Sequence, residues 1–303
     1  MRHLRMFQYL DAVVREGSLR RAANKCFVTA SALDRRVQDL EAEIGTPLFE
    51  RHARGMRLTA AGEIYLAYAR RLMADTQRAL SEIDHLKGLR RGNVSLAISP
   101  AMAFGFAPYI IRIFSAKYPG VSLQVQVVSH DVALRYLLSF DVDLAIIISR
   151  PNNNELVDLV TIDQPLMAIV DKKHPLATKD CIRLTECLEY PLILPGKGLT
   201  TREMLDTKLQ NIETVSKQYI ETNSYEVMRN LVFDSLNIGF GIFLQIQSPS
   251  RGVNEHITHI PISEKDIRPV PIICVQLRNR SLSVPAAQLA NLVTQELGKF
   301  SSR

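Results

Sequence analysis

The sequence lacks the signatures of most catalytic and metal-binding proteins. It contains no P-loop, no GxGxxG nucleotide-binding loop, and no GxSxG elbow around Ser99 that would indicate a hydrolase. The segment 256–259 reads His-Ile-Thr-His but has neither the carboxylate nor the helical spacing of a zinc site, and we expect an exposed strand there. We therefore expect no enzyme activity, no cofactor and no metal.

Disulfide and membrane signatures are missing as well. The four cysteines form no CxxC pair. The longest run without charge, between Arg91 and Arg112, contains Pro100, Gly105, Pro108 and several polar residues, which is typical of strand, loop and helix and not of a membrane span. The N-terminus shows no apolar segment of a signal peptide. We expect a cytoplasmic protein that makes no membrane contact.

The charge of the chain is distributed unevenly. A length of 303 residues predicts two or three domains, and 47% hydrophobic with 22% charged residues excludes a disordered or collagen-like protein. Residues 1–91 contain 17 Lys and Arg against 11 Asp and Glu, whereas the rest of the chain contains 20 of each. A basic first third is typical of a module that binds a polyanion, and a solvated basic surface is the alternative.

The basic third has the pattern of a helix-turn-helix. Apolar residues recur at helical spacing from Leu4 to Val14, and Gly17 ends that helix. Ser18 and Thr29 are suited to cap a second and a third helix, and Gly45 stops the third. In the third helix we expect four residues to face inward, Leu33, Val37, Leu40 and Ile44, and five polar or small residues to face outward, Ala30, Ser31, Asp34, Arg35 and Gln38.

A basic hairpin follows the third helix. Arg51, Arg54 and Arg57 lie within seven residues, which is typical of a wing whose tip enters the minor groove while the third helix enters the major groove. A plain three-helix core that binds no nucleic acid is the alternative. The DNA-contacting residues that we predict are Ser18, Thr29, Ala30, Ser31, Asp34, Arg35, Gln38, Arg51 and Arg54.

Residues 4–63 resemble the winged helix-turn-helix of LysR-type transcriptional regulators. The matching features, at fixed spacing, are Leu4, Phe7, Gly17-Ser18, Ala22-Ala23, Arg35, Leu40-Glu41, Gly45, Pro47-Leu48-Phe49, Arg51, Leu58-Thr59 and Gly62. Ala30 stands where the family often has Gln, and Asp34 where it often has Ser. Two alternatives remain open for Asp34: its carboxylate accepts from cytosine N4, or it forms a salt bridge to Arg35 or to neighbours near Gln38 that orients the helix.

A long helix follows the wing. Thr59 can cap a helix to about Leu89, and its apolar positions repeat every three and four residues, which predicts a coiled-coil seam. A core helix of one domain is the alternative. The predicted seam residues are Tyr65, Ala69, Leu72, Thr76, Ala79, Ile83 and Leu86. The resemblance implies that this segment is a dimerising linker, that the chain forms homodimers and homotetramers, and that RNA polymerase is a possible partner.

The neutral two-thirds alternates between strand-like and helix-like stretches, which predicts parallel sheets with helices on both faces. Gly88 to Gly92 has the composition of a linker. The resemblance, through KYPGVSLQV, DVDLAI, KKHPLA and IGFGI, implies a periplasmic-binding-protein-like effector domain of two α/β subdomains that are joined near 162–166 and 261–268. The predicted organisation is α/β multidomain: a winged helix-turn-helix at 1–59, a linker helix at 60–89, and an effector domain at 92–303, with subdomain I at 92–162 and 268–303 and subdomain II at 163–267.

Polar residues follow three predicted strands where helices begin. Strand ends and helix N-termini in α/β sheets bind anionic or polar ligands, and Lys197 and Arg202 can supply a counter-charge. Ordinary helix caps are the alternative. The predicted effector-binding residues are Ser99, Pro100, Ala101, Gly196, Lys197, Gly198, Thr200, Thr201, Arg202, Asn223, Ser224 and Gly241.

Taken together, these features predict a ligand-responsive transcription regulator. It binds double-stranded promoter DNA, and a carboxylate or polar metabolite controls it. The alternative is a cytoplasmic solute-binding or sensory module that acts through a protein partner, and an enzyme is the third choice. Cys181 and Cys187 are either a redox switch, as in the peroxide-sensing branch of the family, or small buried apolar residues.

Overall fold

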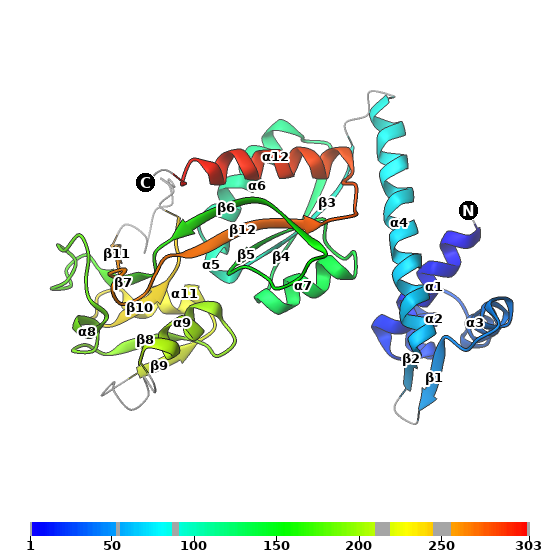
Figure 1. Cartoon of the computed structure of the whole chain (residues 1–303), viewed down its shortest axis with the longest axis horizontal. Coiled ribbons are helices and arrows are strands. Elements are labelled where there is room, and N and C mark those ends of the chain that lie inside the picture. Colours follow the sequence, from blue (N-terminus) through cyan, green and yellow to red (C-terminus); the bar gives the residue numbers. More distant parts are fainter. Residues whose placement is uncertain (1, 53–54, 87–90, 210–218, 245–255, 302–303) are drawn as a thin grey trace. The chain divides into compact units, whose positions relative to one another are not determined.

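The computed structural model describes residues 2–52, 55–86, 91–209, 219–244 and 256–301. The chain forms two compact units, residues 1–87 (unit 1) and 88–303 (unit 2), which are coloured from blue to cyan and from cyan to red in Figure 1. Each unit has its own hydrophobic core. Among the helices of the described ranges, none combines the length and apolar character needed to cross a membrane.

The described residues of unit 1 form four helices and a two-stranded hairpin. The elements are α1 (Arg2–Glu16), α2 (Leu19–Lys25), α3 (Ala30–Ile44), β1 (Phe49–His52), β2 (Gly55–Leu58) and α4 (Ala60–Leu86). The predicted inward residues Leu33, Val37 and Leu40 of α3 are buried, but Ile44 is exposed, because it is the last residue of the helix and extends past the core. The predicted cap is present at Thr29, which accepts from the Ala32 amide, whereas the Ser18 side chain accepts no capping hydrogen bond.

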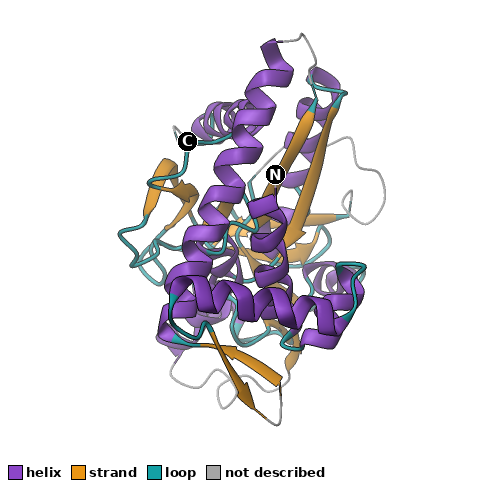
Figure 2. Cartoon of the chain, turned by 90° about the vertical axis from the view of Figure 1, so that its right-hand side faces the viewer, coloured by secondary structure: helices purple, strands orange, loops and turns teal. Residues whose placement is uncertain are grey.

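The hairpin is anchored to the helices through backbone groups. One carboxylate oxygen of Glu41 accepts hydrogen bonds from the amides of Leu48 and Phe49, at 2.7 and 3.0 Å. The amide of Met56 in β2 donates to the carbonyl of Gly17, which has a φ of 59° and ends α1 as predicted. The wing is therefore held against α1 and α3, and Figure 2 shows it extending beyond the helices of unit 1.

Helix α4 begins as predicted, because the Thr59 hydroxyl accepts from the amide of Gly62 at 3.0 Å. The predicted seam is divided in two. Ala69 is fully buried and Tyr65 packs at the edge of the unit 1 core, so this end of the seam belongs to the domain core. Ala79 and Ile83 further along are exposed, and Leu86 ends the helix with a side chain outside the described residues.

Unit 2 contains two five-stranded sheets. Sheet I has the strand order β4-β3-β5-β12-β6, and sheet II has the order β11-β7-β10-β8-β9. The strands of sheet I are β3 (Gly92–Ile98), β4 (Val121–Val127), β5 (Leu144–Ile148), β6 (Leu156–Gln164) and β12 (Val270–Leu277). Those of sheet II are β7 (Met167–Asp171), β8 (Leu192–Pro195), β9 (Tyr219–Thr222), β10 (Ile238–Gly241) and β11 (Ile257–Pro261).

The helices of unit 2 cover these sheets. Their bounds are α5 (Pro100–Ala103), α6 (Phe106–Lys117), α7 (His130–Leu138), α8 (Leu184–Cys187), α9 (Thr200–Leu209), α11 (Tyr225–Val232) and α12 (Val284–Gly298). In β5, Ile146 lies in the core that includes α6 and α12, whereas its neighbour Ile147 lies in the core that includes α7. Alternation along a strand thus places α6 and α12 on one face of sheet I and α7 on the other, as Figure 1 shows.

The prediction of parallel sheets is wrong in part. β3 is parallel to β4 and β5, but β12 is antiparallel to β5 and β6, and β7 is antiparallel to β10 and β11. The antiparallel strands are those that follow a passage between the sheets, because the chain returns from the other sheet in the opposite direction. The passages lie between β6 and β7 and between β11 and β12, close to the predicted joints.

Candidate DNA-binding surface and effector cavity

The outer face of α3 carries the predicted DNA-contacting side chains. Ala30, Ser31, Arg35 and Gln38 are exposed, and Asp34 is half-buried. Thr29 is exposed too, but its hydroxyl is used to cap the helix. Ser18 is half-buried at the start of α2, and Arg54 lies outside the described residues. A polar and basic helix face of this kind fits the major groove of DNA, where side chains reach base edges and phosphates.

Asp34 is joined to the wing. Its carboxylate accepts two hydrogen bonds from the guanidinium of Arg51 in β1, and the amide nitrogen of Gln38 donates to the same carboxylate at 3.3 Å. Of the two alternatives for Asp34, the structure supports the salt bridge, with Arg51 rather than Arg35 as the cation. The hydrogen bond to Asp34 raises the pKa of Arg51. Sequence spacing gives no indication of this pair, because its members lie 17 residues apart on different elements.

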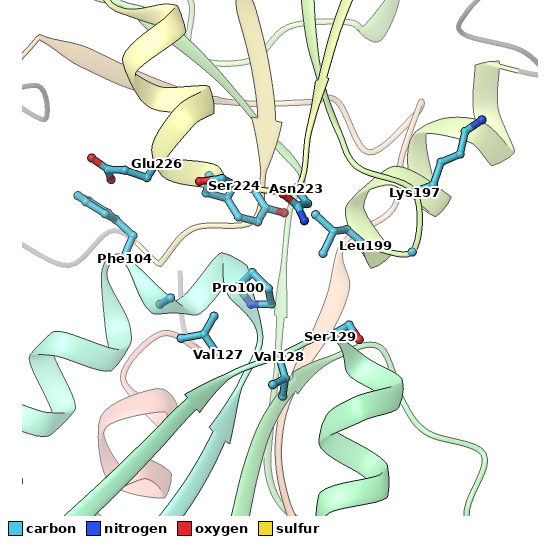
Figure 3. A pocket seen from close by; sticks show the side chains of 13 residues that line it. Pro100, Phe104, Val127, Val128, Ser129, Lys197, Leu199, Asn223, Ser224 and Glu226 are labelled. Atoms are coloured by element: carbon cyan, nitrogen blue, oxygen red, sulfur yellow. The ribbon is translucent and has the colours of Figure 1, made fainter. Parts of the chain in front are cut away.

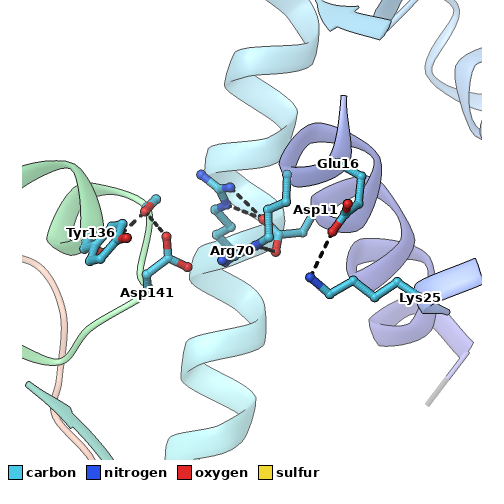
Figure 4. Close-up of polar contacts among 8 residues, drawn as sticks. Asp11, Glu16, Lys25, Arg70, Tyr136 and Asp141 are labelled. Carbon is cyan, nitrogen blue, oxygen red and sulfur yellow. Dashed lines mark hydrogen bonds and ion pairs between the residues drawn. The ribbon is translucent and has the colours of Figure 1, made fainter. Parts of the chain in front are cut away.

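Two further contacts join the helices behind this face of α3. Arg36 donates to the Tyr9 hydroxyl at 3.0 Å and lies over its ring, which ties α3 to α1. Asp11 of α1 accepts from Nε and Nη2 of Arg70 in α4, at 2.7 and 2.6 Å (Figure 4). The sequence does not reveal either contact, since these arginines are not distinguishable from the exposed ones by type or spacing.

Unit 2 contains a cavity of about 700 Å³ between the two sheets. Figure 3 shows side chains from segments near sheet I below it and from segments near sheet II above it. The lining residues are Pro100, Ala103, Phe104, Val127, Val128, Ser129, Lys197, Gly198, Leu199, Asn223, Ser224, Tyr225 and Glu226. The size suits a small molecule, and the combination of apolar walls and a few polar groups is typical of ligand sites.

Four helices begin at the cavity: the short α5 at Pro100, and three longer ones. Ser129 is the N-cap of α7 and Ser224 is the N-cap of α11, where its hydroxyl accepts from the Val227 amide. Gly198 and Leu199 directly precede α9. The N-terminus of a helix carries partial positive charge and free amide groups, so the cavity favours negative charge or hydrogen-bond acceptors in a ligand.

Five of the twelve predicted effector-binding residues line the cavity: Pro100, Lys197, Gly198, Asn223 and Ser224. The other seven, Ser99, Ala101, Gly196, Thr200, Thr201, Arg202 and Gly241, are not among its lining residues. The prediction missed the walls Phe104, Val127 and Val128 because apolar residues at strand and helix ends carry no distinguishing pattern.

Arg202 does not have the role of a counter-charge for a ligand in this structure. Its side chain is 2% exposed, and it donates to the carboxylates of Asp206 and Glu221 at 2.8 and 2.7 Å. Its pKa is raised, with burial opposing the effect of these two hydrogen-bonded carboxylates. Lys197 lines the cavity, but Figure 3 shows its ammonium directed away from the other labelled side chains. The positive polarity of the site therefore comes from the helix N-termini, while Glu226 adds a negative charge to the lining.

A buried arginine lies beside the cavity wall. The guanidinium carbon of Arg229, in α11, lies 3.8 Å from the centre of the Phe104 ring, and its Nη1 lies 3.4 Å from Nε2 of His259. Burial, and to a smaller extent the charge of Arg229, lowers the pKa of His259 to about 4. The predicted strand at 256–259 is present as β11 from Ile257 onward, but no residue of that strand is exposed. His256 is exposed and lies outside the strand, so the prediction of an exposed strand is wrong in its exposure.

The cysteines of this unit do not have the environment of a redox switch. Cys187 is buried, and burial raises the pKa of its thiol to about 12. Cys181 is exposed, and all four cysteines are free. A protonated, buried thiol is a poor nucleophile, so the structure favours the alternative in which Cys187 is a small apolar residue of the core. No group of three or more metal-binding side chains occurs in the described parts of the chain.

Comparison with protein families decides the assignment. Residues 4–63 match the model of the bacterial regulatory helix-turn-helix proteins of the LysR family, and residues 87–298 match the model of the LysR substrate-binding domain. The chain belongs to the LysR family. It is a ligand-responsive DNA-binding transcriptional regulator, as predicted, with a helix-turn-helix and an effector-binding domain.

Curated relatives include other LysR-family regulators. The RuBisCO operon transcriptional regulator of Allochromatium vinosum is 31% identical over 203 residues, which are 67% of each chain. The HTH-type transcriptional activator CmpR of Synechocystis is 25% identical over 287 residues, covering 93% of this chain and 92% of that protein.

Solved structures of LysR regulators share the fold. A full-length variant of OxyR from Pseudomonas aeruginosa superimposes with a TM-score of 0.67 at 20% identity, over 99% of this chain and 95% of that one. Full-length CbnR in complex with its target DNA gives a TM-score of 0.57 at 19% identity, over 96% of this chain and 99% of that one. At these identities the likeness establishes the fold and not the ligand.

Proposed function

We propose that this regulator binds an interrupted inverted repeat in promoter DNA as a homodimer. In this proposal the winged helix-turn-helix is residues 1–59, the linker helix 60–89 and the effector domain 92–303. The α3 side chains Ser31, Arg35 and Gln38 contact bases and phosphates, and Ala30 offers only its methyl group, for example to a thymine methyl. The exposed polar face of α3, with Arg35 at its centre, is the observation that supports these DNA contacts.

The dimer forms through α4. Four large apolar side chains of this helix are exposed in the single chain: Ile64, Tyr68, Leu80 and Ile83. A second chain would cover such residues, since exposed apolar side chains that gather on one helix favour association. Of these four, Ile83 belongs to the predicted seam. We also propose a homotetramer and a contact with RNA polymerase, and these two proposals are supported by the family likeness alone.

Sedimentation tests the dimer. An Ile83→Glu change should shift the protein toward monomer and weaken binding to a two-half-site duplex, because it places a charge in the seam. Glu82→Gln is the matched control, since Glu82 is exposed and pairs with Arg78 within its own helix at 3.1 Å. An Ile83→Glu protein that remains a dimer would contradict the assignment of α4.

The effector is a small anion or a strongly polar molecule that occupies the cavity between the sheets. The start of α7 on one side and those of α9 and α11 on the other support this, because residues at these three helix starts line the same cavity and a helix N-terminus attracts negative charge. Closure of the two sheets on the ligand would move the parts of the dimer relative to one another and change half-site engagement, as a population shift between two states.

Single-atom changes in the cavity lining test the sign of the ligand charge. Asn223→Asp adds a negative charge and should weaken binding of carboxylates or phosphate esters, whereas Glu226→Gln removes one and should strengthen it. Gln124→Glu, at an exposed position of β4, adds the same charge outside the lining and serves as the control. Calorimetric titration with a panel of mono- and dicarboxylates and phosphate esters measures the effect. A ligand that binds equally to all variants would place the site elsewhere.

A further inference from the structure

Asp34 stands on the face of α3 that the proposed function places against DNA, although a carboxylate is repelled by phosphates. Both of its oxygens are engaged within the protein. Oδ1 accepts from Arg51, and Oδ2 accepts from Gln38 at 3.3 Å and from Nη1 of Arg51 at 3.5 Å. A carboxylate that already accepts three hydrogen bonds has little capacity left for a cytosine amino group.

Arg51 is the other half of this arrangement. It lies in β1 of the wing, and its side chain is 53% exposed while that of Asp34 is 31% exposed. An exposed arginine beside the recognition helix would ordinarily contact a phosphate. The bonds to Asp34 use two of the five N–H donors of the guanidinium and hold it in place, and a phosphate that approached the remaining donors would also meet the negative charge of Asp34. Both effects oppose a phosphate contact by Arg51.

We propose that Asp34 is a positioning residue that holds Arg51 on the protein and so lowers sequence-independent affinity for DNA, without reading a base itself. This inference rests on the proposed placement of α3 against DNA. Each phosphate contact contributes about 0.9 to the slope of log affinity against log salt concentration. Release of Arg51 should therefore change that slope by a predictable amount, whatever the DNA sequence.

The experiment compares variants of the full chain by fluorescence anisotropy over a series of salt concentrations. The probes are a duplex recovered by selection with the wild-type protein and an unrelated duplex of equal length. Asp34→Asn keeps the shape of the side chain but removes its charge and one acceptor oxygen, which weakens its hold on Arg51, and we expect it to steepen the slope by up to about 0.9 on both duplexes. Between roughly 50 and 200 mM salt, the ratio of the affinity of the variant to that of the wild type should therefore fall by up to about 3–4-fold.

Two controls separate this effect from the loss of one negative charge. In an Arg51→Gln background, Asp34→Asn should leave the slope unchanged, because the arginine through which Asp34 acts is absent. Asp39→Asn removes a charge from an exposed position of the same helix, away from the hydrogen bonds of Arg51, and should change the slope much less. A slope change that persists without Arg51 would overturn the proposal.

Base scanning, in which each base pair of the selected duplex is replaced in turn, tests the alternative that Asp34 reads a base. If Asp34 reads cytosine, Asp34→Asn would alter the preference at one base pair and leave the salt slope as it is, which would overturn the proposal. An Arg35→Gln variant tests the underlying surface. Unchanged DNA affinity in that variant would overturn the placement of α3 on DNA, and the proposal with it. Lost affinity there, with no slope change in Asp34→Asn, would overturn the role of Asp34 alone.

Discussion

Replacing Asp11 by alanine should weaken the attachment of α1 to the linker helix α4. Asp11 and Arg70 join α1 to α4 with side chains only 14% and 16% exposed, and two hydrogen bonds of 2.7 and 2.6 Å connect them. Hydrogen bonds between charged groups contribute about 1.5–3 kcal/mol each, and part of that is lost to solvent at this exposure. We expect the Asp11→Ala change to lower the free energy of unfolding of unit 1 by about 2 kcal/mol.

The assay is thermal unfolding of the full chain, followed by calorimetry so that the transition of unit 1 is resolved. A loss of this size should lower the Tm of a unit of about this length by roughly 10 °C. Glu16→Ala is the control, because Glu16 pairs with Lys25 at 2.9 Å but that lysine is 63% exposed (Figure 4). Equal falls in Tm for the two variants, or none for Asp11→Ala, would refute the reasoning.

Two further predictions concern packing and pH. A Cβ at Gly62 would lie 2.0 Å from the carbonyl oxygen of Leu48, so Gly62→Ala should destabilise unit 1 by about 1–3 kcal/mol in denaturant titration, and a stable variant would contradict this close approach. The pKa of His259 is about 4 in the folded chain against an ordinary value of 6.5, so the unfolded chain binds more protons between these values. Stability of unit 2 should fall by up to about 3 kcal/mol as pH drops from 6.5 to about 4, and His259→Gln should remove that part of the pH dependence. An unchanged pH profile in His259→Gln would contradict the assignment.

Local sequence signals predicted most elements of the fold. The caps at Thr29 and Thr59 and the stops at Gly17 and Gly45 lie at the expected positions, because they depend on hydrogen bonds and backbone angles within a few residues. Strand direction in unit 2 was not predictable in the same way. Whether β12 runs parallel or antiparallel to β5 depends on where the chain re-enters the sheet, and no local pattern encodes that.

The part of the effector cavity that is formed by residues at the starts of helices could be predicted from the sequence. Asn223 and Ser224 follow a strand and begin a helix, which the sequence shows, and both line the cavity. The apolar wall at Phe104 comes from a distant segment, and its identity depends on how the two sheets face each other. Arg202 is a cation close to a helix start, as the prediction of a counter-charge requires, but it forms salt bridges with carboxylates on α9 and β9 instead.

The decisive experiment for a sequence-specific dimer is in vitro selection of genomic DNA fragments by the purified full chain at near-physiological salt, followed by sequencing. We predict recovery of an interrupted inverted repeat, with half-sites separated by about one or more turns of DNA. An Arg35→Gln variant in a parallel selection should recover the motif poorly or not at all. Uniform recovery of fragments without a motif, by wild type and variant alike and also with cell extract present as a source of effector, would contradict a sequence-specific dimeric regulator.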